Sequence, residues 1–177
     1  MSSWAHINGV IRIRHMLYEA FDSKGLREVH ERNCQWVRRI FGPQSDNAID
    51  VESEMDIEAT ATIPMGSEGT IHWRCTPLSS AFPDFEQGRT GTINRYLYDG
   101  FFIEFGGDLR DIEPEEGPAM VREWFTSVLD QLGEYFLIRQ ATCELDMDYR
   151  DEKTIFSAEM DYVSSKKDKI YEASIIK

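Results

Sequence analysis

Three short segments from the first half of the chain recur in the second half, about ninety residues later. The spacing between the matched segments drifts by only about one residue, which indicates two halves of equal construction. Such a chain is expected to place two acidic strands at equivalent positions. The matched segments are residues 8–11 with 99–102, 37–42 with 128–133, and 54–58 with 144–148.

Hydrophobic periodicity in the first half, residues 1–76, predicts the element order β-α-β-β. Alternation of apolar and polar residues is typical of a half-buried strand, whereas apolar residues three and four apart indicate an amphipathic helix. Gly42-Pro43 supplies the stop signal expected at the end of that helix. The predicted elements are a strand over residues 7–16, a helix over 23–41, and strands over 51–63 and 70–75.

The second half, residues 89–177, is expected to follow a connector over residues 77–88, which has two prolines and no clear period. Asp99-Gly100 is a favoured two-residue turn because both positions accept positive φ, so we expect a hairpin around it. An apolar stripe after Pro118 predicts a helix that ends at Gly133. The remaining predicted elements are a hairpin of strands 136–149 and 154–162, and an edge strand over 170–176.

This order of elements predicts an α+β fold of two ferredoxin-like (β-α-β-β) halves. The halves are expected to form one compact unit, with two amphipathic helices on one face of an antiparallel sheet. The other face of the sheet would then meet water or a partner.

The charge of the chain limits its partners. Thirty-two acidic against 19 basic residues give a formal net charge of -13. Such a charge repels phosphate backbones and anionic membranes, so direct binding to nucleic acid or membrane is not expected. No apolar run of about eighteen residues and no secretory signal pattern occur, which favours the cytoplasm.

Signatures of catalysis and of cofactor binding are missing from the sequence. There is no Walker-type loop, Gly-x-Ser-x-Gly elbow, dinucleotide fingerprint or His-x-x-x-His spacing. Cys34, Cys75 and Cys143 have no Cys-x-x-Cys spacing, and each lies on an apolar face, so buried reduced thiols are expected. His30 belongs to the apolar stripe of its helix and is expected to be partly buried and hydrogen-bonded. The sequence therefore favours a non-enzymatic protein without a cofactor or a metal site.

Two acidic ladders are the main candidate for a binding surface. Alternate strand residues share a face about 6.6 Å apart, and like charges in such an array repel one another. The ladder could imitate the charges of a nucleic-acid backbone and bind a basic protein groove. The alternatives are a solvated face neutralised by bases such as Arg12, Arg14 and Lys153, or a site for a hard cation. The candidate partner-binding residues are Glu54, Asp56, Glu58, Glu144, Asp146, Asp148, Glu159 and Asp161.

A second candidate site consists of polar residues near the matched turns of the two halves. His6, Asn8, His72 and Asp99 could form a polar pocket if equivalent positions of the halves come together. This alternative predicts a small-ligand-binding protein or a hydrolase, with a concave pocket and with indifference to charge on the ladders.

The opening Trp4-x-His6-x-Asn8-Gly9-x-Ile11-Arg12 resembles the start of small uncharacterised proteins carried by phages and prophages. This resemblance implies a bacterial host cell. Together with the acidity, it implies an inhibitor of a nucleic-acid-handling host machine, such as an anti-CRISPR-like protein. The expected partner is a nuclease or other nucleic-acid-binding protein with a basic surface. Tandem ferredoxin-like halves also commonly pair their edges, and such pairing would give a homodimer.

Overall fold

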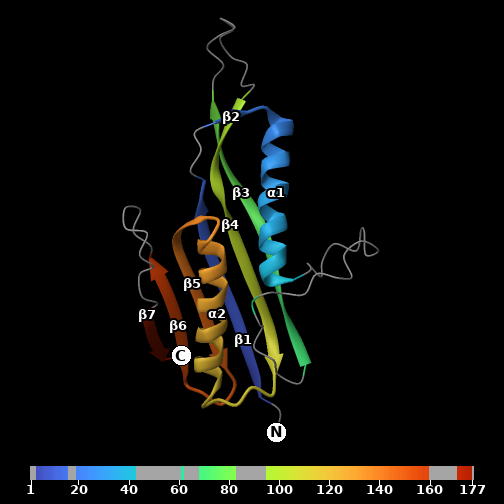
Figure 1. The fold of residues 1–177 in the computed structure, drawn as a ribbon. Coiled ribbons are helices and arrows are strands. Elements are labelled where there is room, and N and C mark those ends of the chain that lie inside the picture. The colour runs from blue at the N-terminus through green and yellow to red at the C-terminus, as the bar shows by residue number, and fades with distance from the viewer. Residues whose placement is uncertain are drawn as a thin grey trace, which may run out of the picture.

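The computed structural model describes residues 3–15, 19–42, 61, 68–82, 95–159 and 171–176. Its strands form one antiparallel sheet, with two long helices (Figure 1). In chain order the elements are β1 (Trp4–Arg14), β2 (Ala20–Phe21), α1 (Ser23–Phe41), β3 (Glu68–Phe82), β4 (Arg95–Arg110), α2 (Gly117–Gly133), β5 (Leu137–Met147), β6 (Glu152–Glu159) and β7 (Tyr171–Ile176).

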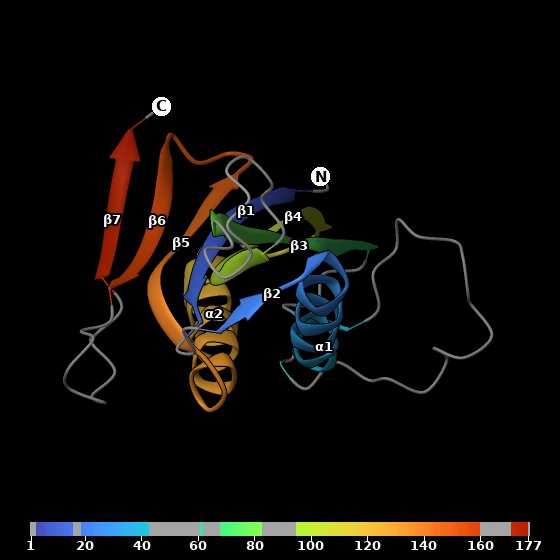
Figure 2. The ribbon, with the colours of Figure 1, turned by 90° about the horizontal axis from the view of Figure 1, so that it is seen from above.

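The centre of the sheet is the antiparallel pair of β1 and β4. Beyond β1 lie β5, β6 and β7, and beyond β4 lies β3. The short β2 pairs with β4 just past the end of β1, with Ala20 opposite Leu97. Viewed along the sheet, α1 and α2 both lie on one face of it (Figure 2). The predicted α+β class, with two helices on one face of an antiparallel sheet, is therefore confirmed.

The two halves of the chain interleave within this sheet. Because β4 pairs antiparallel with both β1 and β3, the strands β1 and β3 run parallel with β4 between them. In the same way β4 and β5 run parallel with β1 between them. Each half therefore places the strand after its helix beside the first strand of the other half. The ferredoxin-like description of the halves stays a prediction, because the strand predicted over residues 51–63 of the first half lies outside the described residues apart from Ala61.

Local sequence signals set the ends of both helices. The Asp22 carboxylate accepts a hydrogen bond from the Gly25 amide at 2.7 Å, which caps the start of α1. At the other end Gly42 has φ 88°, and its amide donates to the Arg38 carbonyl at 2.8 Å. Pro118 occupies the first turn of α2. The predicted helices are confirmed within one residue at each end.

Alternating burial divides each strand between the two faces of the sheet. On β1 the odd-numbered residues face the helices and, apart from the half-buried Gly9, are buried, while the even-numbered residues are at least partly exposed. Burial of these apolar side chains is the main stabilising term in such a domain. The largest fully buried side chains are Tyr98, Phe101, Phe125, Phe156, Ile7, Ile11, Ile13, Ile103, Leu109, Leu129, Leu132 and Ile138.

The hairpin predicted at Asp99-Gly100 is wrong, because β4 runs through these residues as one continuous strand. Gly100 has φ 132°, and a Cβ there would lie 2.1 Å from the Ile13 carbonyl oxygen. Glycine at this position therefore allows the backbone of β1 to approach closely. On the other side of β4, the register of β3 shifts between Leu78 and Ser79. Pairing on both sides of β4 keeps the chain extended where its local preference is to turn.

The connector was predicted over residues 77–88, but its predicted start falls within a strand. Strand β3 continues through Pro77 to Phe82, and the rest of the segment lies outside the described residues. Among the described strands β3 is paired with β4 alone, so Pro77 lies on an edge strand, where a missing backbone N–H is tolerated.

Candidate partner-binding face

The face of the sheet opposite the helices carries most of the candidate residues that the structure describes. We call it the open face. The β-register aligns His72, Gly106, Asn8 and Glu144 in one row across β3, β4, β1 and β5. The next row contains Thr70, Asp108, His6 and Asp146. The open face includes the carboxylates of Glu104, Asp108, Glu144, Asp146 and Asp148.

His6 lies between two aspartates that come from the strands on either side of β1. Its Nδ1 is 2.6 Å from Oδ1 of Asp108, which belongs to β4. Its Nε2 is 3.9 Å from Oδ1 of Asp148, directly after β5. The side chains of His6 and Asp148 are 43% exposed and that of Asp108 is 62% exposed, so this cluster is open to solvent.

Lys153 neutralises part of the acidic ladder on β5. Its Nζ lies 2.6 Å from Oε1 of Glu144 and 3.4 Å from Oδ2 of Asp146. Hydrogen bonding to Glu144 raises the pKa of Lys153. One lysine thus offsets the repulsion between two neighbouring carboxylates, as expected for a solvated face that carries its own counter-ions.

A second ion pair on the open face joins the edge strand β3 to the central strand β4. Arg74 Nε on β3 donates to Oε2 of Glu104 on β4 at 2.6 Å. This hydrogen bond lowers the pKa of Glu104 and raises that of Arg74. Thr76 also donates to the same carboxylate oxygen at 3.4 Å.

Asn8 and Gly106 fit together at the middle of the open face. A Cβ at Gly106 would lie 2.8 Å from Oδ1 of Asn8, so the asparagine side chain leans over the glycine of the neighbouring strand. His72 is exposed on β3 and pairs with Gly106 from the side of β4 opposite Asn8. His6, Asn8 and His72 therefore share the open face as neighbours of the ladder.

Asp99 does not join these three residues. It lies nine residues from Asp108 along β4, which corresponds to about 30 Å of extended strand. Its carboxylate accepts a hydrogen bond from the Ser80 hydroxyl, and its carbonyl accepts one from the His15 amide at 3.0 Å.

The remaining sequence candidates are only partly within the described residues. Glu159 is exposed on β6, opposite Gln140. Glu54, Asp56, Glu58 and Asp161 lie outside the described residues, so the first ladder stays a prediction.

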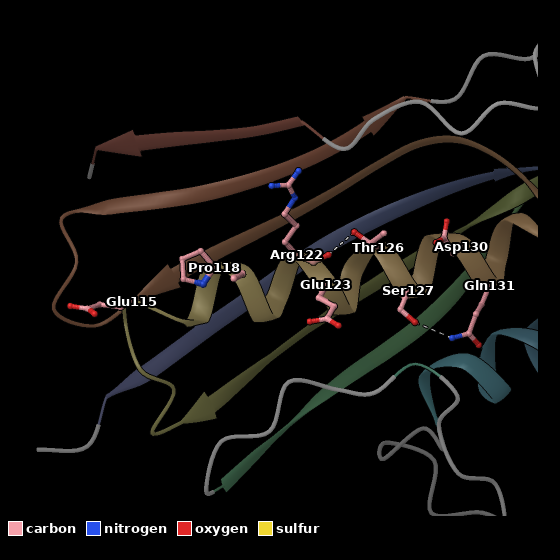
Figure 3. A pocket seen from close by; sticks show the side chains of 9 residues that line it. Glu115, Pro118, Arg122, Glu123, Thr126, Ser127, Asp130 and Gln131 are labelled. Carbon is pink, nitrogen blue, oxygen red and sulfur yellow. Dashed lines mark hydrogen bonds between the residues drawn. The ribbon is translucent and has the colours of Figure 1, made fainter.

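A surface hollow of about 710 Å³ lies along α2, away from the open face (Figure 3). Several of its polar groups bond within the helix, since Thr126 donates to the Arg122 carbonyl and Gln131 donates to Ser127. No residue of the second candidate site lines it. Its lining in the described part of the chain is Glu115, Pro118, Ala119, Arg122, Glu123, Thr126, Ser127, Asp130 and Gln131.

Within the described ranges, no group of three or more histidine, cysteine, aspartate or glutamate side chains is arranged to hold a metal ion. Over the same ranges, neither helix combines the length and apolar character needed to span a bilayer.

One cluster was missed by sequence reasoning. Cys143 is buried, as predicted, but Cys34 and Cys75 are only partly buried and hydrogen-bond to one another across α1 and β3. His30, one helical turn before Cys34, lies beside the same sulfur. The spacing of His30 and Cys34, four residues apart on a helix, is the one signal that could have placed them together.

Comparison of the chain with protein-family models, curated proteins and solved structures gives no match.

Proposed function

We propose that the protein is a non-enzymatic binding protein whose open face engages a basic surface of a protein partner. The observation that carries this proposal is the convergence of Asp108 and Asp148 on His6 from the two strands that flank β1. Both carboxylates are substantially exposed, so they can accept charge-assisted hydrogen bonds from arginine or lysine side chains. The formal net charge of -13 would add long-range attraction to a basic partner.

In its finer form the proposal names the partner as a nuclease or other nucleic-acid-handling protein of a bacterial host cell. The chain would then act as a phage-type, anti-CRISPR-like inhibitor that presents carboxylates in place of phosphates. Support comes from Glu144 and Asp146, which lie about 6.6 Å apart at alternate positions of β5, and from Asp148 directly after the strand. Lys153 limits this support because it already offsets two of these charges, which makes Asp108 and Asp148 the better contact points.

The test is a binding experiment on basic proteins with a charge-neutral variant. A bacterial lysate is passed over heparin, and the retained basic fraction is applied to the immobilised natural protein and to an Asp108→Asn, Asp148→Asn variant. A matched control carries Glu123→Gln and Asp130→Asn, which remove two exposed carboxylates from α2. Salt-sensitive retention of one nucleic-acid-binding protein by the natural protein and the control, and its loss from the variant, would support the proposal. Equal retention by all three, or none, would refute it.

A second candidate is a small-ligand-binding protein or hydrolase that uses His6, Asn8 and His72. The 2.6 Å contact of His6 with Asp108 favours it, since a carboxylate beside one ring nitrogen is the arrangement of a histidine general base. Ligand screening by thermal shift separates the two candidates. A small ligand that raises the unfolding temperature of the natural protein and not of a His6→Gln variant would favour this second function.

The homodimer expected from the sequence also belongs to this proposal. Strand β7 lies at the edge of the described sheet, where a second copy could add its own edge strand. Light scattering coupled to size exclusion would give a mass of twice 20.5 kDa for the dimer.

A further inference from the structure

Four polar side chains meet on the helix side of the sheet, where α1 packs against β3 and β4. His30 Nε2 lies 3.5 Å from Cys34 Sγ, one turn further along α1. The other ring nitrogen of His30, Nδ1, lies 2.8 Å from the hydroxyl of Tyr98 on β4. From β3, the Cys75 thiol donates a hydrogen bond to the Cys34 sulfur. The cluster thus places two sulfurs and an oriented imidazole in contact.

Tyr98 holds the ring of His30 at Nδ1, which leaves Nε2 facing the Cys34 sulfur. The Asn33 amide nitrogen donates to the Tyr98 oxygen at 3.4 Å. A Tyr98 hydroxyl that donates to Nδ1 of His30 leaves the ring hydrogen on Nε2, where it faces Cys34. Asn33 is 9% exposed and Tyr98 2% exposed, so this orienting pair is held in the core. A nucleophile beside a histidine that a third group orients is an activated arrangement.

The surroundings of the two sulfurs shift their pKa values in opposite directions. The hydrogen bond from Cys75 is the largest cause that lowers the pKa of Cys34 to about 5, and burial opposes it. A hydrogen bond from His30 and the positive charge of Arg38 lower the same pKa further. The pKa of Cys75 is raised because its thiol donates to Cys34 and is desolvated. The contact between the two sulfurs thus favours the thiolate form of Cys34 and the thiol form of Cys75.

We propose that Cys34 is a peroxide-reactive cysteine and that Cys75 closes a disulfide with it. In the first step the Cys34 thiolate attacks one oxygen of hydrogen peroxide, which breaks the O–O bond and gives Cys34 sulfenic acid and hydroxide. In the second step the Cys75 sulfur attacks the sulfenic sulfur, and water leaves as the S–S bond forms. The two cysteines together lose two electrons, and the peroxide is reduced to water and hydroxide. A dithiol such as dithiothreitol returns both sulfurs to the reduced state.

Partial burial suits these sulfurs to this chemistry. Cys34 and Cys75 both retain some exposure, which admits a molecule as small as peroxide. Cys143 is the internal contrast, since it is buried on β5 and burial raises its pKa to about 12. The same chain therefore carries a reactive pair and an inert thiol.

The experiment is oxidation of the reduced full chain by hydrogen peroxide, followed by alkylation in denaturant and peptide mass spectrometry. The expected result is one Cys34–Cys75 disulfide that dithiothreitol reverses, while Cys143 stays alkylatable. A Cys75→Ser variant is expected to stop at Cys34 sulfenic acid, which dimedone traps. Oxidation of Cys34 and Cys143 at equal rates, or a pair other than Cys34 with Cys75, would overturn the proposal.

Iodoacetamide alkylation of the natural chain against pH gives a readout that does not require a disulfide. The rate at Cys34 is expected to reach its plateau below pH 7, and His30→Gln is expected to lower the rate at pH 6 by about ten-fold or more. At about pH 9 the two rates should converge, because an ordinary thiol is then largely ionised. His72→Gln is the matched control, since it removes an exposed histidine from the opposite face. An alkylation midpoint near the ordinary cysteine value in the natural chain would also overturn the proposal.

Discussion

The indole Nε1 of Trp73 donates a hydrogen bond at 3.0 Å to the carbonyl oxygen of Gly42, the residue that ends α1. Both residues are buried, and the Trp73 ring lies 5.9 Å from that of Phe41. Carbonyl groups at the end of a helix lack partners within the helix. A side chain of the edge strand β3 supplies one here, and this contact fixes the helix end to the sheet.

Trp73→Phe should therefore destabilise the protein by about 1–3 kcal/mol, because the buried Gly42 carbonyl loses its donor while an aromatic ring remains. Urea denaturation followed by circular dichroism measures this change. Trp36→Phe serves as control, since Trp36 stacks on Tyr135 near the surface, and about 1 kcal/mol or less is expected there. Equal losses for the two variants would show that the Gly42 bond adds nothing.

Gly9→Ala should destabilise the protein by about 1–3 kcal/mol or more, through overlap in a packed core. A Cβ at Gly9 would lie 2.1 Å from Cζ of Phe105 and 2.6 Å from the Thr142 carbonyl oxygen. Thermal unfolding of Gly9→Ala and of Val10→Ala, the neighbouring substitution on the open face, gives the comparison. A Gly9→Ala protein as stable as the natural one would mean that the ring of Phe105 moves aside without cost.

The free energy of unfolding at acidic pH should depend on the ionisation of Glu104. Its pKa is lowered by the hydrogen bond from Arg74, so the pair stabilises the fold above the ordinary glutamate pKa of about 4.3. That contribution is lost as the pH falls through the lowered pKa. In Arg74→Ala, NMR titration should show the pKa of Glu104 returning toward its ordinary value. An unchanged titration curve would assign the shift to another neighbour, such as Thr76.

Asp22→Ala should cost about 1 kcal/mol of stability, because the Gly25 amide loses its capping acceptor at the start of α1. Asp22→Asn keeps a side-chain oxygen and is expected to lie close to the natural protein. Chemical denaturation of both variants measures the difference. Equal stability of the two variants would argue that the cap contributes nothing.

Lys153→Met should lower the unfolding temperature, because it leaves Glu144 and Asp146 as neighbouring like charges. Since these contacts raise the pKa of Lys153, the loss should be full below the ordinary lysine pKa of about 10.4 and should fade as the pH rises through the raised value. Calorimetry at low and at high salt supplies a further check, because added salt should reduce the difference in unfolding temperature between Lys153→Met and the natural protein. A salt-independent loss would indicate a packing defect.

Local periodicity predicted the elements better than it predicted their assembly. Both helices, the hairpin of β5 and β6, the edge strand β7 and the shared face of Glu144 and Asp146 follow from patterns within a few residues. Pairing such as Ala5 with Met147 joins distant parts of the chain, so no local pattern specifies it. The preference of Asp99-Gly100 to turn was overridden for the same reason, since strands on both sides of β4 hold it extended.

The candidate site was predicted in part. The alternation on β5 placed Glu144 and Asp146 on one face, but the position of Lys153 between these carboxylates depends on the β5–β6 register. His6 and Asn8 were grouped around a turn expected at Asn8-Gly9, which is wrong because both lie within β1. Their place beside the ladder follows from the pairing of β1 with β5. The contact of Cys34 with Cys75 requires the packing of a helix on a strand about forty residues later, which the spacing of cysteines does not encode.

The interleaved order of the strands also governs when the protein can fold. As the chain leaves the ribosome, β1 is made first, yet its two neighbours in the sheet, β4 and β5, are completed only at Arg110 and Met147. Residues 1–82 alone would therefore present β1 and β3 without the strand that joins them. High contact order of this kind slows folding and leaves unpaired edges exposed during synthesis. The chain should acquire its structure in one late cooperative step, after most of it has been made.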